Sequence, residues 1–203
     1  MNVTPSASKA IKFNSSNNGL ETGDIGGSLV LISTVTASSS STVDFTSGID
    51  STYKEYQFHF TDVHPATNDA NLQVNFRDGG SSFDATKTTT FFRAFHTEDG
   101  GSDGLGYRTA NDLAQSTGAA TLNIGAGNEN DECTSGILHL FDPSSTTFVK
   151  HFMCDSNLYE GGNNSHRALV AGYANVTAAI DGVQFSFSSG NIDAGTFKLY
   201  GVS

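Results

Sequence analysis

Apolar and polar residues alternate in short segments through most of the chain beyond residue 28. In residues 183–187, Val183, Phe185 and Phe187 alternate with Gln184 and Ser186, so the three apolar side chains share one face of a strand. Comparable segments predict further strands at residues 29–36, 42–46, 53–61, 71–77, 88–96, 120–124, 136–141, 147–154, 166–173, 176–180 and 196–200.

Helical spacing of apolar residues is almost absent, and only residues 110–117 show it, weakly. About a dozen short strands separated by turns rich in Gly, Ser and Asn are typical of a sandwich or jelly roll. We therefore expect an all-β fold, a two-layer antiparallel β-sandwich that is jelly-roll-like. The strand order stays open.

The first 27 residues differ from the rest, because they are rich in Ser, Asn and Gly and their apolar residues are sparse and aperiodic. Such composition does not build a core. We expect residues 1–27 to form an extended N-terminal arm or linker that serves assembly, and residues 28–203 to form the sandwich domain.

Charge narrows the range of partners. The net charge is −11, and only 15% of residues are charged, so no nucleic acid partner is expected. Acidic residues concentrate between residues 98 and 132, which predicts solvated loops forming an acidic rim or, alternatively, a cation site. No apolar run is long enough to span a bilayer, so we expect no membrane insertion.

The chain has two cysteines, Cys133 and Cys154. A hairpin folded at residues 143–144 would place them opposite one another, and a register shift of one residue would put them on opposite faces. The sequence therefore leaves open whether they are bonded or are two separate thiols.

Four segments together resemble a structural module of tailed bacteriophages, especially marine ones. They read STVTASSSSTVDFTSGIDSTY at 33–53, VHPATND at 63–69, LFDPSS at 140–145 and FSSGNIDAGTFKLYG at 187–201. The resemblance implies a non-enzymatic virion structural protein, an appendage or fibre protein that contributes to host-surface attachment. The alternative role is a capsid decoration or cement protein that stabilises the shell. Other virion proteins and further copies of the chain, as a homo-oligomer, are the implied partners.

Candidate chemistry is sparse. The six histidines lack zinc-site spacing, and no Gly-x-Ser-x-Gly motif is present, so we expect no catalytic residues, no metal and no cofactor. Residues 98–104 carry carboxylates on a Gly-rich loop, which leaves calcium open against a plain solvated loop. A glycan-binding or glycan-degrading appendage remains the alternative from a different functional class.

Residues 157–167 are the best candidate for a recognition loop, the alternative being a flexible connection. An aromatic ring, amides and an arginine suit contact with a polar ligand. Because the chain is acidic, we expect that ligand to be a host-surface neutral glycan or a protein surface. The candidate residues are Asn157, Tyr159, Asn163, Asn164, His166 and Arg167.

Overall fold

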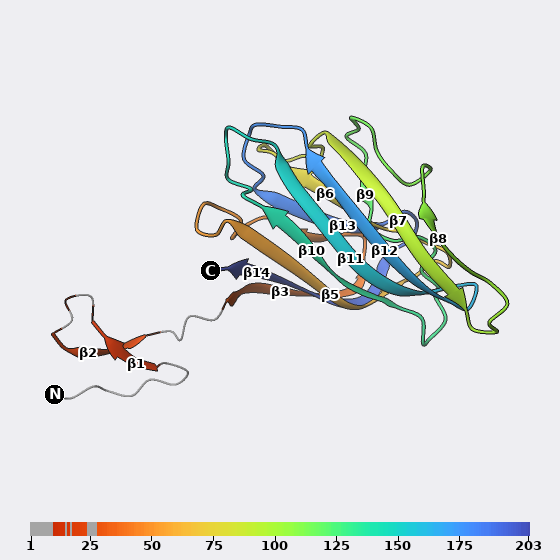
Figure 1. The fold of residues 1–203 in the computed structure, drawn as a ribbon, viewed down its shortest axis with the longest axis horizontal. Helices are drawn as coiled ribbons and strands as arrows, with labels where there is room; N and C mark the ends of the chain where they lie inside the picture. The colour runs from red at the N-terminus through yellow and green to blue at the C-terminus, as the bar shows by residue number, and fades with distance from the viewer. Residues whose placement is uncertain (1–9, 15, 17, 24–27) are drawn as a thin grey trace.

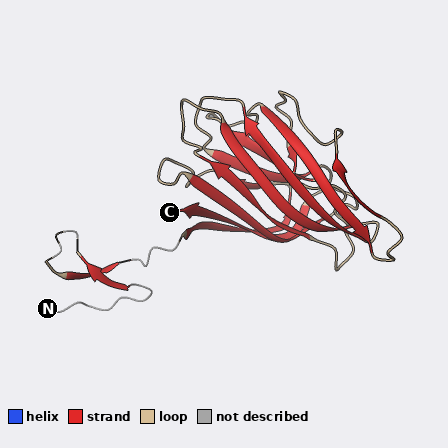
Figure 2. Ribbon diagram, viewed as in Figure 1, coloured by secondary structure: helices blue, strands red, loops and turns tan. Residues whose placement is uncertain are grey.

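The computed structural model describes residues 10–14, 16, 18–23 and 28–203, and residues 28–203 form two antiparallel sheets packed face to face (Figures 1 and 2). The larger sheet has the order β3 (Leu29–Ser40), β14 (Ile192–Val202), β5 (Glu55–Pro65), β10 (Thr134–Phe141), β11 (Lys150–Glu160), β12 (Asn164–Ala174), β7 (Lys87–Thr97) and β8 (Asp103–Tyr107). The smaller sheet has the order β4 (Val43–Phe45), β13 (Gly182–Phe187), β6 (Leu72–Arg77) and β9 (Ala120–Thr121). The described residues contain no helix long and apolar enough to cross a membrane.

Aromatic side chains fill the space between the two sheets. Phe185 of β13 is fully buried, and its ring centroid lies 5.9 Å from that of Phe58, 6.2 Å from Phe60 and 5.1 Å from Phe197. Alternation along each strand sends these rings inward, as the sequence pattern predicts. The all-β sandwich is confirmed, and its division into eight and four strands supplies the order that the sequence left open.

The described part of the arm contains a small hairpin of β1 (Ala10–Phe13) and β2 (Leu20–Gly23). Phe13 pairs with Leu20 on one face, and Lys12 forms an ion pair with Glu21 on the other, with the Nζ and Oε1 atoms 3.5 Å apart. The arm is therefore not extended throughout. Residues 1–9, 15, 17 and 24–27 lie outside the described residues, and the role of the arm in assembly stays a prediction.

The predicted strand at residues 176–180 is wrong, and strand β8 was not predicted. Residues 176–180 form no strand, and residues 110–117 form a loop in which Ser116 bridges to Lys87. Strand β8 was missed because its glycines, Gly104 and Gly106, have no side chain to reveal an alternating pattern. Tertiary pairing with β7 overrides the weak local signals here.

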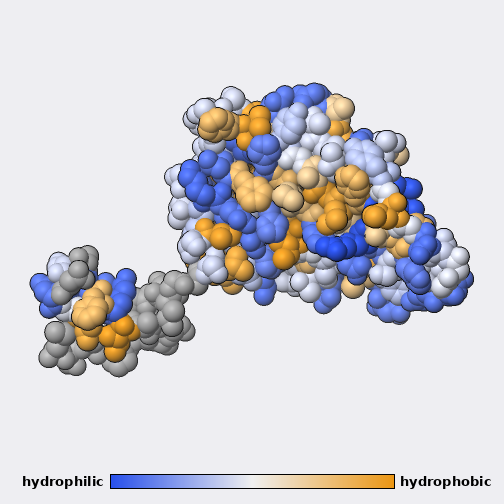
Figure 3. All heavy atoms as spheres, in the orientation of Figure 1, coloured by the Kyte–Doolittle hydropathy of each residue, from blue (hydrophilic) through white to orange (hydrophobic). Residues whose placement is uncertain are grey.

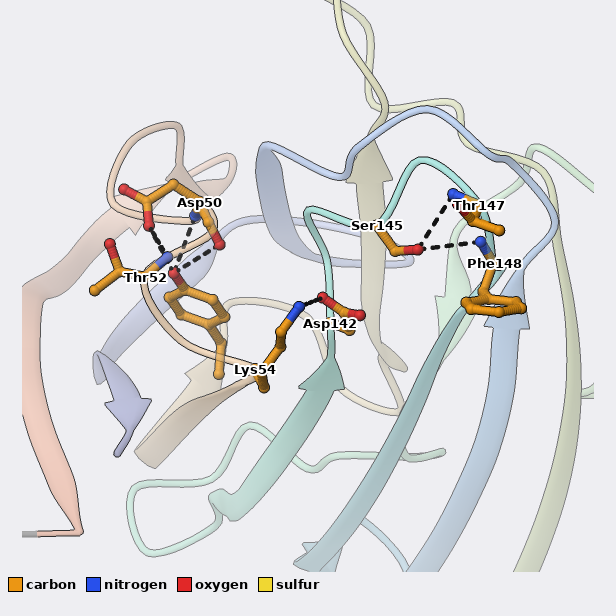
Figure 4. Close-up of polar contacts among 8 residues, drawn as sticks. Asp50, Thr52, Lys54, Asp142, Ser145, Thr147 and Phe148 are labelled. Carbon is orange, nitrogen blue, oxygen red and sulfur yellow. Dashed lines mark hydrogen bonds and ion pairs between the residues drawn. The ribbon is translucent and has the colours of Figure 1, made fainter.

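The predicted hairpin register is also wrong. Leu138 lies opposite Cys154, and residues 142–149 form a loop rather than a tight turn. Ser145 Oγ accepts hydrogen bonds from the backbone N–H groups of Thr147 and Phe148, at 3.3 and 3.1 Å, which holds this loop in shape (Figure 4). Lys54 Nζ reaches Asp142 Oδ1 at 2.9 Å and ties the loop to the start of β5. The cysteines are consequently not opposite each other, and both thiols are free.

Two lysines, Lys87 and Lys150, are fully buried, and Lys87 opens strand β7. Lys87 is fully buried, and its Nζ donates to Ala85 O at 2.8 Å and to Asn75 Oδ1. Burial lowers the pKa of Lys87 to about 8, and the negative charges of Asp84 and Asp78 oppose that shift.

Candidate functional site

An apolar groove of about 600 Å³ crosses the outer face of the eight-stranded sheet, the face that points away from the smaller sheet. We call it the outer groove. Figure 3 shows apolar residues gathering on this face of the molecule, over β11, β12 and β7. Its lining residues are Glu55, Thr90, Phe92, His139, Phe141, Met153, Cys154, Asp155, Leu169, Val170 and Ala171.

Strand register brings these distant residues together. Met153 lies opposite Ala171, which lies opposite Thr90, and this forms one row across β11, β12 and β7. The next row consists of Asp155, Leu169 and Phe92, and Tyr107 of β8 extends it. Because neighbouring strands lie about 4.8 Å apart, such rows form a continuous surface.

Three apolar side chains of the outer groove are open to solvent, whereas Cys154 and Val170 of its lining are buried in the core. Met153 is 54% exposed, and Leu169 and Phe92 are each 45% exposed. The ring of Phe92 meets Tyr107 edge to face at 5.1 Å between centroids, and the ring of Phe141 stacks with His139 at 6.2 Å. Contiguous apolar surface of this kind marks an interaction site more often than scattered exposed residues do.

A hydrogen bond between His139 and Glu55 and an ion pair between Arg167 and Asp155 form the polar rim of the groove. His139 Nδ1 lies 2.8 Å from Glu55 Oε1. Partial burial would raise the pKa of Glu55, but hydrogen bonds from Gln57 and His139 outweigh it and lower the pKa overall. Arg167 donates from Nε and a terminal nitrogen to the two oxygens of Asp155, at 2.9 and 2.6 Å. These hydrogen bonds lower the pKa of Asp155, so both rim carboxylates are held as anions and can accept hydrogen bonds from a ligand hydroxyl.

The predicted recognition segment is not a loop but a strand hairpin, because most of it belongs to β11 and β12 and only residues 161–163 turn. Asn157, Tyr159 and Asn164 line a polar hollow of about 350 Å³ near that turn. Asn163 lines a second one of about 280 Å³. Arg167 points outward into the ion pair with Asp155 and thus lies beside the outer groove.

His166, the sixth predicted recognition residue, faces the interior. It is fully buried, and neither ring nitrogen has a hydrogen-bond partner. Burial lowers its pKa, which favours the neutral ring. Its side chain cannot reach an external ligand, because Arg167 and Ser165 occupy the outward positions on either side of it along β12.

Acidic residues of the 98–132 stretch meet near the β11–β12 turn. The pKa of Tyr159 is raised by partial burial and then by a hydrogen bond to Glu98 and the charges of Asp131 and Glu132. Glu132 is buried rather than solvated, and its Oε2 accepts from the Glu129 N–H at 2.7 Å. The expectation of uniformly solvated acidic loops is therefore wrong at this residue.

The loop at 98–104 is organised by its own hydrogen bonds. Asp99 Oδ1 accepts from Thr97 Oγ1 at 2.7 Å and from the Gly101 N–H at 2.8 Å. In the part of the chain that the structure describes, no three metal-ligating side chains gather in a group that could hold an ion.

Sequence reasoning missed the outer groove. The outward positions of β7 and β12 include Phe92 and Leu169, whereas a strand with one solvated face alternates apolar and polar residues strictly. Apolar residues on both faces were the available signal. Such a pattern is also typical of a strand buried on both faces, and the exposure of Phe92 and Leu169 in the described structure shows that the outer face is open to solvent.

Comparison of the chain with protein-family models, curated proteins and solved structures finds no match. The chemistry of the site consequently rests on the residues themselves.

Proposed function

We propose that this chain is a non-enzymatic structural protein of a tailed-phage particle, displayed as an appendage or fibre component, and that its outer groove contributes to host-surface attachment. The sequence segments that resemble the phage module support the first part. The outer groove is the observation that carries the second part, because its exposed side chains Phe92, Met153 and Leu169 lie outside the core between the two sheets.

The chemistry of the groove fits a neutral glycan or an apolar protein segment. Phe92 and Phe141 offer flat apolar surface, on which the apolar face of a sugar ring packs. Glu55 and Asp155 at the rim accept hydrogen bonds from hydroxyl groups. A net charge of −11 disfavours polyanions such as DNA or acidic polysaccharides.

A cell-binding assay tests the attachment role. Labelled protein is incubated with candidate host bacteria before and after enzymatic removal of their surface polysaccharide. We expect Phe92→Ala combined with Leu169→Ala to reduce binding about tenfold or more, since loss of central apolar contacts commonly weakens binding by more than 1 kcal/mol.

Phe148→Ala is the matched control. Phe148 is a 71% exposed phenylalanine in the loop between β10 and β11, and it does not line the outer groove. Retained binding is expected for this variant. Equal loss in both variants, or no binding to any host by the wild-type chain, contradicts the attachment role.

Catalysis is tested in the same samples by measuring released saccharides. We expect none. Steady release that disappears when one carboxylate between residues 98 and 132 is changed to its amide would establish a glycan-degrading appendage instead.

The decoration role is the second candidate, and the β1–β2 hairpin favours it. Ile11, Phe13 and Leu20 form an exposed apolar face on a two-stranded hairpin, a structure that is marginal in water without a surface to cover it. Immunogold labelling and copy counting on purified particles separate the roles. A few copies on a tail or fibre support an appendage, and many copies on the capsid lattice support decoration.

A further inference from the structure

The edges of the two sheets are protected very unequally. The edge strands are β3 and β8 in the larger sheet and β4 and β9 in the smaller one. Strands β4, β8 and β9 have only three, five and two residues, and β8 begins with Asp103. Strand β3 has twelve. Proteins normally blunt a long edge with charge, proline or a covering segment, because its free N–H and C=O groups invite another strand.

Strand β3 carries none of the usual blocking residues. Its sequence, LVLISTVTASSS, contains no charged residue and no proline. One register shift, at Leu199 and Tyr200 of β14, interrupts its pairing, and residues 33–38 beyond that point pair with β14 without a break. This stretch is a continuously paired, neutral edge.

Apolar side chains at this edge are incompletely covered. Leu29 and Leu31 are 43% and 53% exposed. Ile32 and Val35 pack against the core but remain only partly buried. Another strand hydrogen-bonded to β3 would cover these side chains, as β14 does on the other side.

We propose that β3 pairs in antiparallel fashion with β3 of a second copy of this chain, so that two eight-stranded sheets join into one across a two-fold axis. An antiparallel pair of identical strands is self-complementary and closes as a dimer. Opposed Ser and Thr side chains, which β3 supplies from Ser33 to Ser40, form favourable cross-strand pairs. The proposal is independent of the proposed function.

The distribution of charge favours a second copy of this chain as the partner that pairs with the β3 edge. Each chain has a net charge of −11, so two copies approach readily only along a strip that carries no acidic residue. The edge at β8 begins with Asp103 and follows the acidic loop of Glu98 and Asp99, whereas β3 is neutral throughout.

Light scattering coupled to size-exclusion chromatography on the full chain, over a wide range of protein concentration, tests the proposal. A dimer is expected for the wild type. Thr36→Lys places a charge on the exposed outer side of β3, and pairing would bring the two lysines of the dimer near the same axis. We expect the midpoint of dissociation to rise to a concentration about tenfold higher or more, since like-charge juxtaposition is strongly unfavourable at an interface.

Thr61→Lys is the matched control, because Thr36, Thr196 and Thr61 form one row across β3, β14 and β5. The added charge is identical, both positions are exposed, and Thr61 lies two strands away from the edge. The control should dimerise like the wild type. A wild type that stays monomeric, or equal dimerisation of Thr36→Lys and Thr61→Lys, overturns the proposal.

Hydrogen exchange supplies a readout that needs no variant. Within residues 33–38, the amides that point away from β14 should become protected as concentration rises, while the amides of β8 should not change. The N-terminal arm is the alternative segment that could pair with the β3 edge. Deletion of residues 1–27 tests whether it does. If the deletion abolishes the dimer while Thr36→Lys leaves it intact, the arm forms the contact and the β3 pairing is wrong.

Discussion

The two sheets share one core, but their outer faces differ in polarity. The outward positions of the smaller sheet are all polar in its two central strands, as shown by Gln73 and Asn75 on β6 and Gln184 and Ser186 on β13. The outward positions of the larger sheet carry the exposed apolar residues of the outer groove. Packing requires only one apolar face per sheet, so the smaller sheet shows what folding alone demands. The exposed apolar residues of the outer groove are therefore more than the packing of the two sheets requires.

The largest effect should come from the shared core. Phe185→Ala removes a fully buried ring that contacts Phe58, Phe60 and Phe197, and it should lower the free energy of unfolding by about 3–5 kcal/mol. Urea unfolding measures this change in the free energy of unfolding. The exposed ring of Phe148 is the control, and its loss should change stability by less than about 0.5 kcal/mol. Similar values for the two variants would mean that the inner face is misassigned.

Lys87 should make stability depend on alkaline pH. Its pKa is about 8 in the folded chain and 10.5 in its ordinary state, so between these values the unfolded chain binds a proton that the folded chain does not. The contribution of Lys87 to the free energy of unfolding therefore rises as the pH increases between these two pKa values, by about 3 kcal/mol in total. Lys87→Met should lack this rise in urea unfolding at stepped pH. Parallel pH curves for the variant and the wild type would rule the effect out.

A smaller effect is expected at a glycine of β10 where the neighbouring strands β5 and β11 of the same sheet leave no room for a side chain. A Cβ on Gly136 of β10 would lie 2.6 Å from Asp155 O and 2.6 Å from the Phe60 ring. Gly136→Ala should therefore cost about 1–3 kcal/mol through overpacking. Gly106→Ala on β8 has open space around the new Cβ and serves as the control, with little change in the thermal midpoint. A stable Gly136→Ala variant would show that β10 and β11 can separate freely.

The smallest change in stability should come from the outer groove. Phe92→Ala removes an exposed ring whose edge-to-face contact with Tyr107 is worth about 0.5–1.5 kcal/mol, so unfolding should shift by about 1 kcal/mol. Gln184→Ala on the smaller sheet gives the matched measurement on the polar face. Destabilisation by Phe92→Ala as large as that by Phe185→Ala would mean that the outer groove is part of the folding core.

Much of the fold follows from local sequence pattern. Alternation predicted β6 and β13 almost to the residue, and it assigned Phe185 and Phe187 to the buried face. This works because side chains alternate across a strand with period two, whatever the neighbouring strand is. The same rule fails for β8, whose glycines leave no pattern, and for residues 176–180, whose apolar residues are not paired into a sheet.

The sequence predicted the position of only some residues of the candidate site. Asn157, Tyr159 and Asn164 were correctly grouped near one turn, because residues close in sequence stay close in a hairpin. His166 was grouped with them by composition, although the alternation of β12 turns it inward. The role of all six residues in recognition stays a prediction.

Sequence by itself determined that this chain forms strands with a Phe-rich inner face, since period-two alternation is a local property of the backbone. Tertiary structure determined which outward residues become neighbours and which long strand lies at the edge of its sheet. Phe92, Met153 and Leu169 lie in three strands and meet only because β11 and β12, and β12 and β7, pair in one particular register. The long neutral edge of β3 exists only because the chain places that strand last in the sheet. Register and strand order depend on the free energy of the whole core, which no single segment encodes.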